Sequence, residues 1–227
     1  MLEHRSADFQ VLAGPVPIKS GRVPPRRSRR GDRRRLRSVA MTSTPSPDRP
    51  TERDFRLLLE RTGADLLPGL TGAEFETVEQ DLGFRFAADH RTMLSAALPT
   101  GKGWPNWRHG GARDLRARLA LPAEGVLFDV EHNAFWPDEW GTRPAQLKHA
   151  LKSARYHLAR VPRMVPVYGH RYLPGIEGQW GHPVLSMMQT DIVVYGANLT
   201  DYLTAEFLDG SIEYAEPTVP FWRDLVS

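Results

Sequence analysis

The sequence predicts an α+β fold in which helices come first and a mixed, largely antiparallel sheet with flanking helices follows. Two observations lead to this class. Residues 51–121 carry apolar side chains at helical spacing behind two capping sequences. Residues 126–195 contain four short runs rich in β-branched or other apolar residues, which are typical of strands. Helices followed by strands with few helices between them are typical of α+β domains.

The chain of 227 residues divides into a leader and a body of opposite charge. Residues 1–50 hold twelve Lys or Arg and four Asp or Glu, a net charge of +8, whereas residues 51–227 hold 18 basic and 23 acidic residues, a net charge of −5. The basic character therefore belongs to the leader, and it gives no reason to expect nucleic-acid binding by the body. The body has the size of a single domain with a substantial core.

The leader is rich in Arg and Pro and offers little apolar surface to bury, so we expect residues 1–50 to be a disordered leader and linker. Met41 follows the arginine run, and the whole chain has 26 Arg against 4 Lys, which suggests a GC-rich genome. We hypothesise that the native chain starts at Met41. The alternatives are an arm that binds nucleic acid or an anionic membrane, and a mitochondrial transit peptide.

The chain contains no cysteine. This excludes a disulfide framework, a thiolate zinc site, an iron–sulfur cluster and a cysteine nucleophile. No run of 18 apolar residues is present, so no membrane span is predicted. We expect a cytoplasmic protein without a cofactor or a membrane partner.

The first half of the body is predicted to be helical. Thr51 with Asp54 and Thr71 with Glu74 have the spacing of capping boxes, and Gly83 is placed to end the second helix. A short extended link should follow. Further helices are expected over residues 88–98, where Pro99 would end the helix, and over residues 114–121.

The second half is predicted to be mixed. Val126, Phe128 and Val130 alternate with Leu127, Asp129 and Glu131, which favours a strand over residues 126–130 with one face buried. Pro144 is placed at the first position of a helix whose buried stripe runs from Leu147 to Val161. The other expected elements are strands over residues 164–168, 184–188 and 192–195, a hairpin turn at Gln189-Thr190, a helix over residues 199–208 and a terminal turn over residues 221–226.

Two stretches resemble the SUKH superfamily, the group related to the fungal Smi/Knr cell-wall assembly regulator. Residues 69–98 contain a capped acidic helix, Leu82-Gly83, a short extended link and then Asp89-His-Arg91, which is similar to the family's Pro-x-Asp-(Tyr/Leu)-Arg pattern. Ala87 stands where the family usually has a proline. Residues 189–203 look like the family's closing strand and helix. The resemblance covers roughly residues 55–208, and its motifs are structural.

The resemblance implies a binding module formed by residues 51–227. Bacterial SUKH proteins are typically intracellular immunity proteins that neutralise toxins, often nucleases, by occluding them, and the fungal relatives are scaffolds. Neither role needs an active site or a cofactor. We therefore expect a non-enzymatic protein-binding module, either a bacterial immunity protein or an intracellular adaptor, whose partner is a protein such as a toxin domain. The acidic body would complement a basic partner surface.

Six aromatic residues are candidates for the recognition surface because they fall in segments rich in Gly, Pro and Asn. Large rigid side chains in loops are good interface anchors. The alternative is that they pack beneath their own loops. The candidates are Trp104, Trp107, Phe135, Trp136, Trp140 and Trp180.

The competing function is a small metal-dependent hydrolase or oxygenase that uses imidazole and carboxylate ligands. Its ligands would be Glu131, His132, His170 and His182. No helical His-Glu-x-x-His spacing is present, and neighbours in a strand would point to opposite faces. We therefore expect no metal site. The distinctive segment of residues 128–136 receives no chemical assignment.

A basic stripe of Lys148, Lys152 and Arg155 lies opposite the apolar stripe of the predicted helix after Pro144. Such a stripe is typical of the solvated face of a helix. We expect no nucleic-acid binding by the folded domain.

Overall fold

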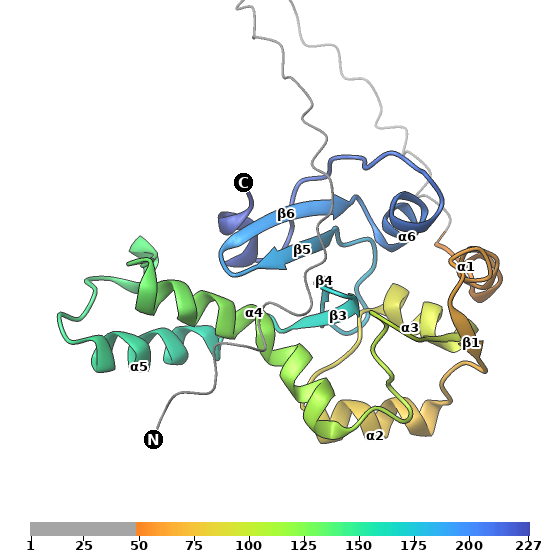
Figure 1. The fold of residues 1–227 in the computed structure, drawn as a ribbon, viewed down its shortest axis with the longest axis horizontal. Coiled ribbons are helices and arrows are strands. Elements are labelled where there is room, and N and C mark those ends of the chain that lie inside the picture. Colours follow the sequence, from red (N-terminus) through yellow and green to blue (C-terminus); the bar gives the residue numbers. More distant parts are fainter. Residues whose placement is uncertain (1–48) are drawn as a thin grey trace, which may run out of the picture. The chain divides into compact units, whose positions relative to one another are not determined.

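The computed structural model describes residues Arg49–Ser227. The predictions for Met41 and for the rest of residues 1–48 lie outside this part. The described residues form six α-helices and two antiparallel sheets, which confirms the predicted α+β class (Figure 1). None of these helices is both long enough and apolar enough to cross a bilayer.

The helical first half forms as predicted. It contains α1 (Glu52–Leu59), α2 (Gly72–Leu82) and α3 (Ala88–Ala96). Thr51 and Thr71 each cap a helix, and the carboxylates of Asp54 and Glu74 accept hydrogen bonds from their backbone N–H groups at 2.8 Å. These reciprocal bonds satisfy donors that have no partner within the helix. Gly83 adopts φ +69° and ends α2.

The extended link between α2 and α3 is held by the buried carboxylate of Glu79. One oxygen accepts a hydrogen bond from the backbone N–H of Phe86 at 3.0 Å, and the other accepts one from the guanidinium of Arg85 at 2.8 Å. The guanidinium of Arg91 lies 3.3 Å from the first oxygen. Because the carboxylate is almost completely desolvated, these three partners are what makes its burial tolerable.

A small two-stranded sheet joins the start of the domain to the end of α3. Strand β1 (Asp65–Leu67) pairs antiparallel with β2 (Leu98–Thr100). Neither strand was predicted, since each has only three residues. Pro99, expected to follow the helix end directly, lies inside β2, and α3 already ends at Ala96.

The predicted strand over residues 126–130 is wrong. These residues belong to α4 (Ala112–His132), which continues eleven residues beyond the expected helix 114–121. Val126 and Val130 are buried four residues apart on one helical face, whereas Phe128 is 43% exposed. A short apolar run fits a strand and a buried helix equally well when only its periodicity is read.

The next helix also begins later than predicted. A short 3₁₀ turn, η1 (Asp138–Trp140), precedes α5 (Leu147–Leu158), so Pro144 lies three residues before the first helical residue. Leu147, expected to be buried, is 42% exposed. The buried stripe of α5 consists of Ala150, Ala154 and Leu158.

The larger sheet is antiparallel throughout, with strand order β3-β4-β5-β6. Its strands are β3 (Met164–Tyr168), β4 (Arg171–Pro174), β5 (Val184–Met188) and β6 (Asp191–Gly196). The predicted hairpin at Gln189-Thr190 is confirmed, and Gln189 has a φ of +58°. Strand β4 was not predicted, because only two apolar residues, Tyr172 and Leu173, lie between its arginine and its proline. The closing elements α6 (Leu199–Phe207) and η2 (Trp222–Leu225) lie close to the expected positions.

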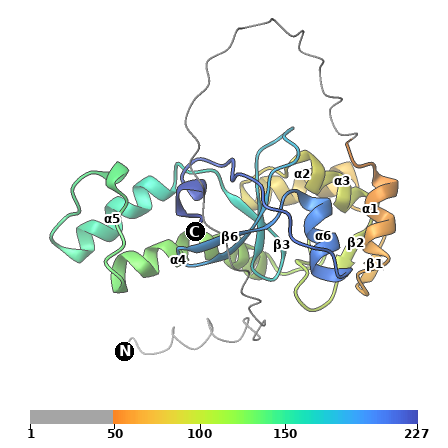
Figure 2. The same ribbon diagram turned by 90° about the horizontal axis from the view of Figure 1, so that it is seen from above.

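Two hydrophobic clusters form the core, and α4 contributes to both. Leu115 and Leu119, in its first half, pack with α1, α2, α3 and α6. Val126, Leu127 and Val130, in its second half, pack with α5, one part of the larger sheet and η2. The helix therefore connects the two clusters, since it contacts both α2 and α5 (Figures 1 and 2).

The turn of the β5–β6 hairpin docks on the second half of α4. The carboxylate of Asp129 accepts hydrogen bonds from the backbone N–H and the hydroxyl of Thr190, at 2.9 and 2.7 Å. One helical turn earlier, Gly125 lets the turn approach closely, because an added Cβ would lie 2.8 Å from the Cα of Gln189. The two contacts fix the position of the hairpin on the helix.

The replacement Gly125→Ala should destabilise the protein by about 1–3 kcal/mol, because the backbone of Gln189 would have to move away from the helix. Gly72→Ala, also in a helix but with nothing within 4 Å, is the matched control and should be neutral or stabilising. Urea unfolding followed by circular dichroism measures both. Equal stabilities of the two variants would contradict this packing.

A buried histidine predicts a specific loss of stability in acid. The imidazole of His90 is enclosed between Phe86 and Trp107, and neither ring nitrogen has a hydrogen-bond partner. Burial lowers its pKa from the ordinary 6.5 to about 3. Between these values the unfolded chain binds a proton that the folded protein does not, so stability falls as the pH is lowered through this window.

The variant His90→Leu should therefore lose less stability than the wild type when the pH falls from 7 to 5, by about 2 kcal/mol. Urea unfolding at both pH values tests this, and His109→Gln, at an exposed position, is the control. Parallel pH dependences of His90→Leu and the wild type would show that His90 does not cause the loss.

Candidate partner-binding groove

Two of the predicted aromatic anchors point into the core. The ring of Trp104 stacks on Phe207 at 5.4 Å, and the ring of Trp107 packs on Phe84 and Phe86 at 5.7 and 5.1 Å. Both indoles are nearly inaccessible to solvent. The prediction that both residues lie in a loop is confirmed. Their indole side chains belong to the first hydrophobic cluster, so they are not available to a partner.

The loop of Trp104 and Trp107 is fastened by Arg108. Its guanidinium donates to the backbone carbonyls of Pro68 and Gly69, both at 2.9 Å, and pairs with the carboxylate of Glu74. The hydrogen bonds from Arg108 and Thr71 lower the pKa of Glu74 to about 2. The capping carboxylate of α2 thus also anchors a loop that lies far away in the sequence.

The aromatic residues between α4 and α5 form a compact plug. Trp140 is buried with its ring stacked between His157, at 5.2 Å, and Phe221, at 5.7 Å. Phe135 and Trp136 are partly buried and meet the ring of Trp140 edge-on. These side chains close the end of the second cluster, and only Phe135 and Trp136 keep some surface for contact with a partner.

Trp180 lies in the loop between β4 and β5, where it is partly buried. The guanidinium of Arg49 lies 5.3 Å from its ring centroid. The loop is held on the start of α3, since Asp89 accepts a hydrogen bond from the backbone N–H of Gly181 at 3.1 Å. Burial raises the pKa of Asp89. Trp180 is thus separate from the plug around Trp140.

The four proposed metal ligands occupy separate local environments. Glu131 and His132 are exposed on α4, and His132 stacks on Phe128 at 4.3 Å. His170 lies beside Arg171 in the β3–β4 turn, where burial and the arginine lower its pKa to about 4. The ring nitrogens of His182 lie 2.6 Å from the hydroxyl of Thr218 and 2.7 Å from the amide oxygen of Gln179.

Across residues 49–227 the structure forms no group of three or more His, Asp or Glu side chains that could hold a metal ion. Glu131 and His132, expected to point to opposite faces of a strand, are instead neighbours near the end of helix α4. The residues assigned to the competing metal-dependent function are therefore not brought together.

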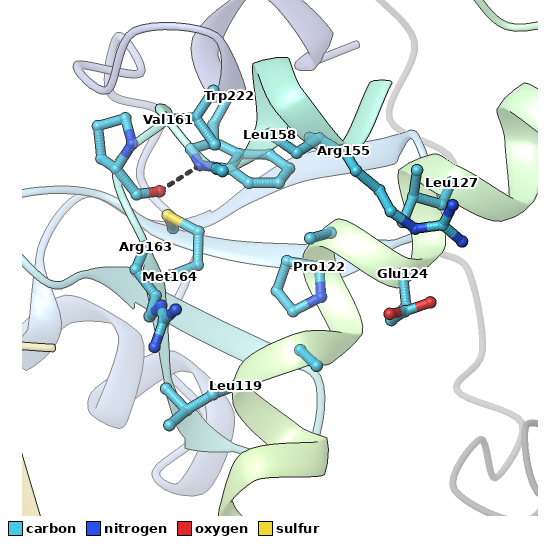
Figure 3. Close-up of a pocket in the computed structure, with 14 residues that line it drawn as sticks. Leu119, Pro122, Glu124, Leu127, Arg155, Leu158, Val161, Arg163, Met164 and Trp222 are labelled. Carbon is cyan, nitrogen blue, oxygen red and sulfur yellow. Dashed lines mark hydrogen bonds between the residues drawn. The ribbon is translucent and has the colours of Figure 1, made fainter. Parts of the chain in front are cut away.

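A groove lies between α4 and the C-terminal end of α5 (Figure 3). Its volume is about 290 Å³. The rim carries exposed Glu124, Arg155 and Arg163. The indole N–H of Trp222 donates to the carbonyl of Pro162 at 2.8 Å, so the ring offers only apolar surface to the groove. The floor consists of the buried side chains of Leu119, Pro122, Leu127, Leu158, Met164 and Trp222.

The groove depends on a proline within α4. Pro122 has no N–H, so the carbonyl of Arg118 loses its helical donor four residues later. The hydroxyl of Tyr172, on β4, donates to this carbonyl at 3.1 Å. This contact between sheet and helix lets α4 continue past the proline, with the pyrrolidine ring in the groove floor.

The exposed face of α5 beside the groove is basic. Lys148, Lys152 and Arg155 are exposed as predicted, and residues 141–176 contain no Asp or Glu. The guanidinium of Arg160 lies 3.4 Å above the ring of Tyr156, which is 58% exposed. An apolar floor beside a basic face can hold an apolar side chain whose flanking residues are acidic.

One sequence signal could have pointed to this groove, namely the proline in the middle of an otherwise helical run. The partner of the freed carbonyl lies 54 residues later in the chain.

Comparison with protein-family models, with curated proteins and with solved structures gave no match.

The role of Tyr172 predicts a coupling with Pro122. Tyr172→Phe should cost about 1–2 kcal/mol, because the carbonyl of Arg118 loses the donor that replaces the missing N–H of Pro122. The same change in a Pro122→Ala background should cost clearly less, since the new backbone N–H can donate to that carbonyl. A double-mutant cycle by urea unfolding measures the coupling. Equal costs in the two backgrounds would show that the hydroxyl does not replace the missing helical bond.

Proposed function

We propose that residues 51–227 form a SUKH-type protein-binding module that acts without catalysis, as a bacterial immunity protein or an intracellular adaptor in the cytoplasm. The observation that carries the proposal is the apolar groove at Pro122 beside the basic face of α5. An apolar concavity with a charged rim is what a protein interface needs for one anchoring side chain and its flanking contacts.

The family resemblance is supported by the order of its elements. The capped helix α2 ends at Gly83, the extended link leads into α3, and strand β6 leads into α6. The long helix α4 and the segment up to α5 lie between these two parts. The groove is lined by α4, the end of α5, residues 161–164 and Trp222, so the proposed recognition surface lies outside the motifs that carry the resemblance.

The dimensions of the groove favour a protein partner over a small molecule. Its volume of about 290 Å³ lies at the lower end of the range for small-molecule sites. Six floor residues are buried and apolar, and the three charged side chains lie on the rim. An apolar floor can accept one side chain of a partner, and charged rim residues can fix the orientation of the chain that carries it.

The proposal is tested by filling the groove. Ala159 is exposed and lines the groove, whereas Ala117 is exposed on α4 and does not line it. Tagged full-length protein with Ala159→Trp should lose a stoichiometric protein partner during purification from its native cells. Wild type and Ala117→Trp should retain it. With the purified partner, Ala159→Trp should raise the dissociation constant at least tenfold in calorimetry.

Thermal unfolding of both tryptophan variants serves as the folding control. Retention of the partner by Ala159→Trp with unchanged affinity would exclude the groove as the recognition surface. Turnover of a small molecule by the pure protein, abolished by substitution of one histidine, would exclude the non-enzymatic function itself.

A further inference from the structure

We propose that, in the free protein, the groove at Pro122 receives residues 209–216 from a second copy of this chain. The proposal uses the groove of the proposed function. Its test measures self-association, so its outcome can be separated from that of foreign-partner binding.

The segment of residues 209–216 presents apolar side chains that its own chain leaves uncovered. Ile212 is 48% exposed and Tyr214 is 72% exposed, and the segment has no helix or strand. Both ends are held, since the backbone N–H of Gly210 donates to the carbonyl of Thr204 at 3.1 Å and Thr218 contacts His182. A loop fixed at both ends loses little conformational freedom when it binds.

The charges of the segment and of the groove surroundings are opposite. Residues 209–216 contain Asp209, Glu213 and Glu216 and no basic residue. The groove rim carries Arg155 and Arg163 against the single acid Glu124, and both arginines lie in the acid-free stretch of residues 141–176. An aromatic side chain between two acids therefore matches an apolar floor beside arginines.

The exposure of the segment favours a second copy over the segment of the same chain. The segment does not fill its own groove, because Tyr214 is exposed within its own chain. Two copies that exchange the segment reciprocally give a closed twofold dimer.

The contact should be weak, because one short segment in each direction buries less than a standard interface. We expect a monomer–dimer equilibrium with a dissociation constant of roughly 1–100 μM. Sedimentation velocity of the full-length protein over this concentration range measures it.

Two charge-reversal variants test the contact from both sides. Lys152→Glu/Arg155→Glu alters the groove side and leaves the hydrogen bond from Arg163 to the carbonyl of Leu82 in place. Glu213→Lys/Glu216→Lys alters the segment. Each variant alone should raise the dimer dissociation constant at least tenfold. An equimolar mixture of the two variants should restore the dimer. In the mixed dimer, one contact joins the native groove to the native segment, and the other joins the acidic groove to the basic segment.

Glu52→Lys/Glu76→Lys, at exposed positions on α1 and α2, is the control with the same change in net charge as the segment variant and should dimerise like the wild type. A monomeric wild type at all concentrations, or a mixture that stays monomeric, overturns the proposal. Dimerisation that persists in both single-sided variants also overturns it, because another surface must then be responsible. None of these results changes the outcome expected for the foreign partner with Ala159→Trp.

Discussion

The hydrogen bond from the hydroxyl of Tyr172 to the carbonyl of Arg118 is the interaction on which the arrangement of the domain depends. It gives a partner to the one helical carbonyl that Pro122 deprives of a donor, and so α4 runs on for ten residues beyond the proline. Because α4 contributes to both hydrophobic clusters, this continuity connects the helical first half to the sheet and α5. It also places the pyrrolidine ring, which needs no hydrogen-bond partner, in the floor of the groove.

Several buried polar side chains of the domain serve to hold segments together. Glu79 fixes the link before α3, Asp89 holds the β4–β5 loop, and Asp129 holds the β5–β6 turn. Each carboxylate accepts hydrogen bonds from backbone N–H groups of another segment, which is how a compact domain tolerates buried charge. These groups are used within the fold. The proposed recognition surfaces are the groove, the basic face of α5 and the acidic segment after α6.

Local signals in the sequence predicted local structure well. The capping boxes at Thr51 and Thr71, the helix end at Gly83 and the Gln189-Thr190 hairpin depend on residues within a few positions of one another, and the structure has all four. The run from Val126 to Val130 was misassigned because its spacing fits two periodicities, and the contacts that favour the helix come from α5 and the hairpin turn. The loop that holds Trp104 and Trp107 was predicted correctly. The direction of each indole ring was not, because it depends on Phe207 and Phe86, which lie far away in the sequence. The groove was not predictable, because its support from Tyr172 is a long-range contact.

We propose that partners are recognised at the groove beside Pro122. Since the chain has no cysteine, a single Ala159→Cys substitution gives a reporter in the groove wall, and Ala117→Cys gives one on the exposed face of α4. The direct measurement is the rate of maleimide modification of each thiol with and without the purified partner. Bound partner should slow modification at position 159 at least tenfold and leave the rate at position 117 unchanged. Equal rates at position 159 with and without bound partner would contradict it.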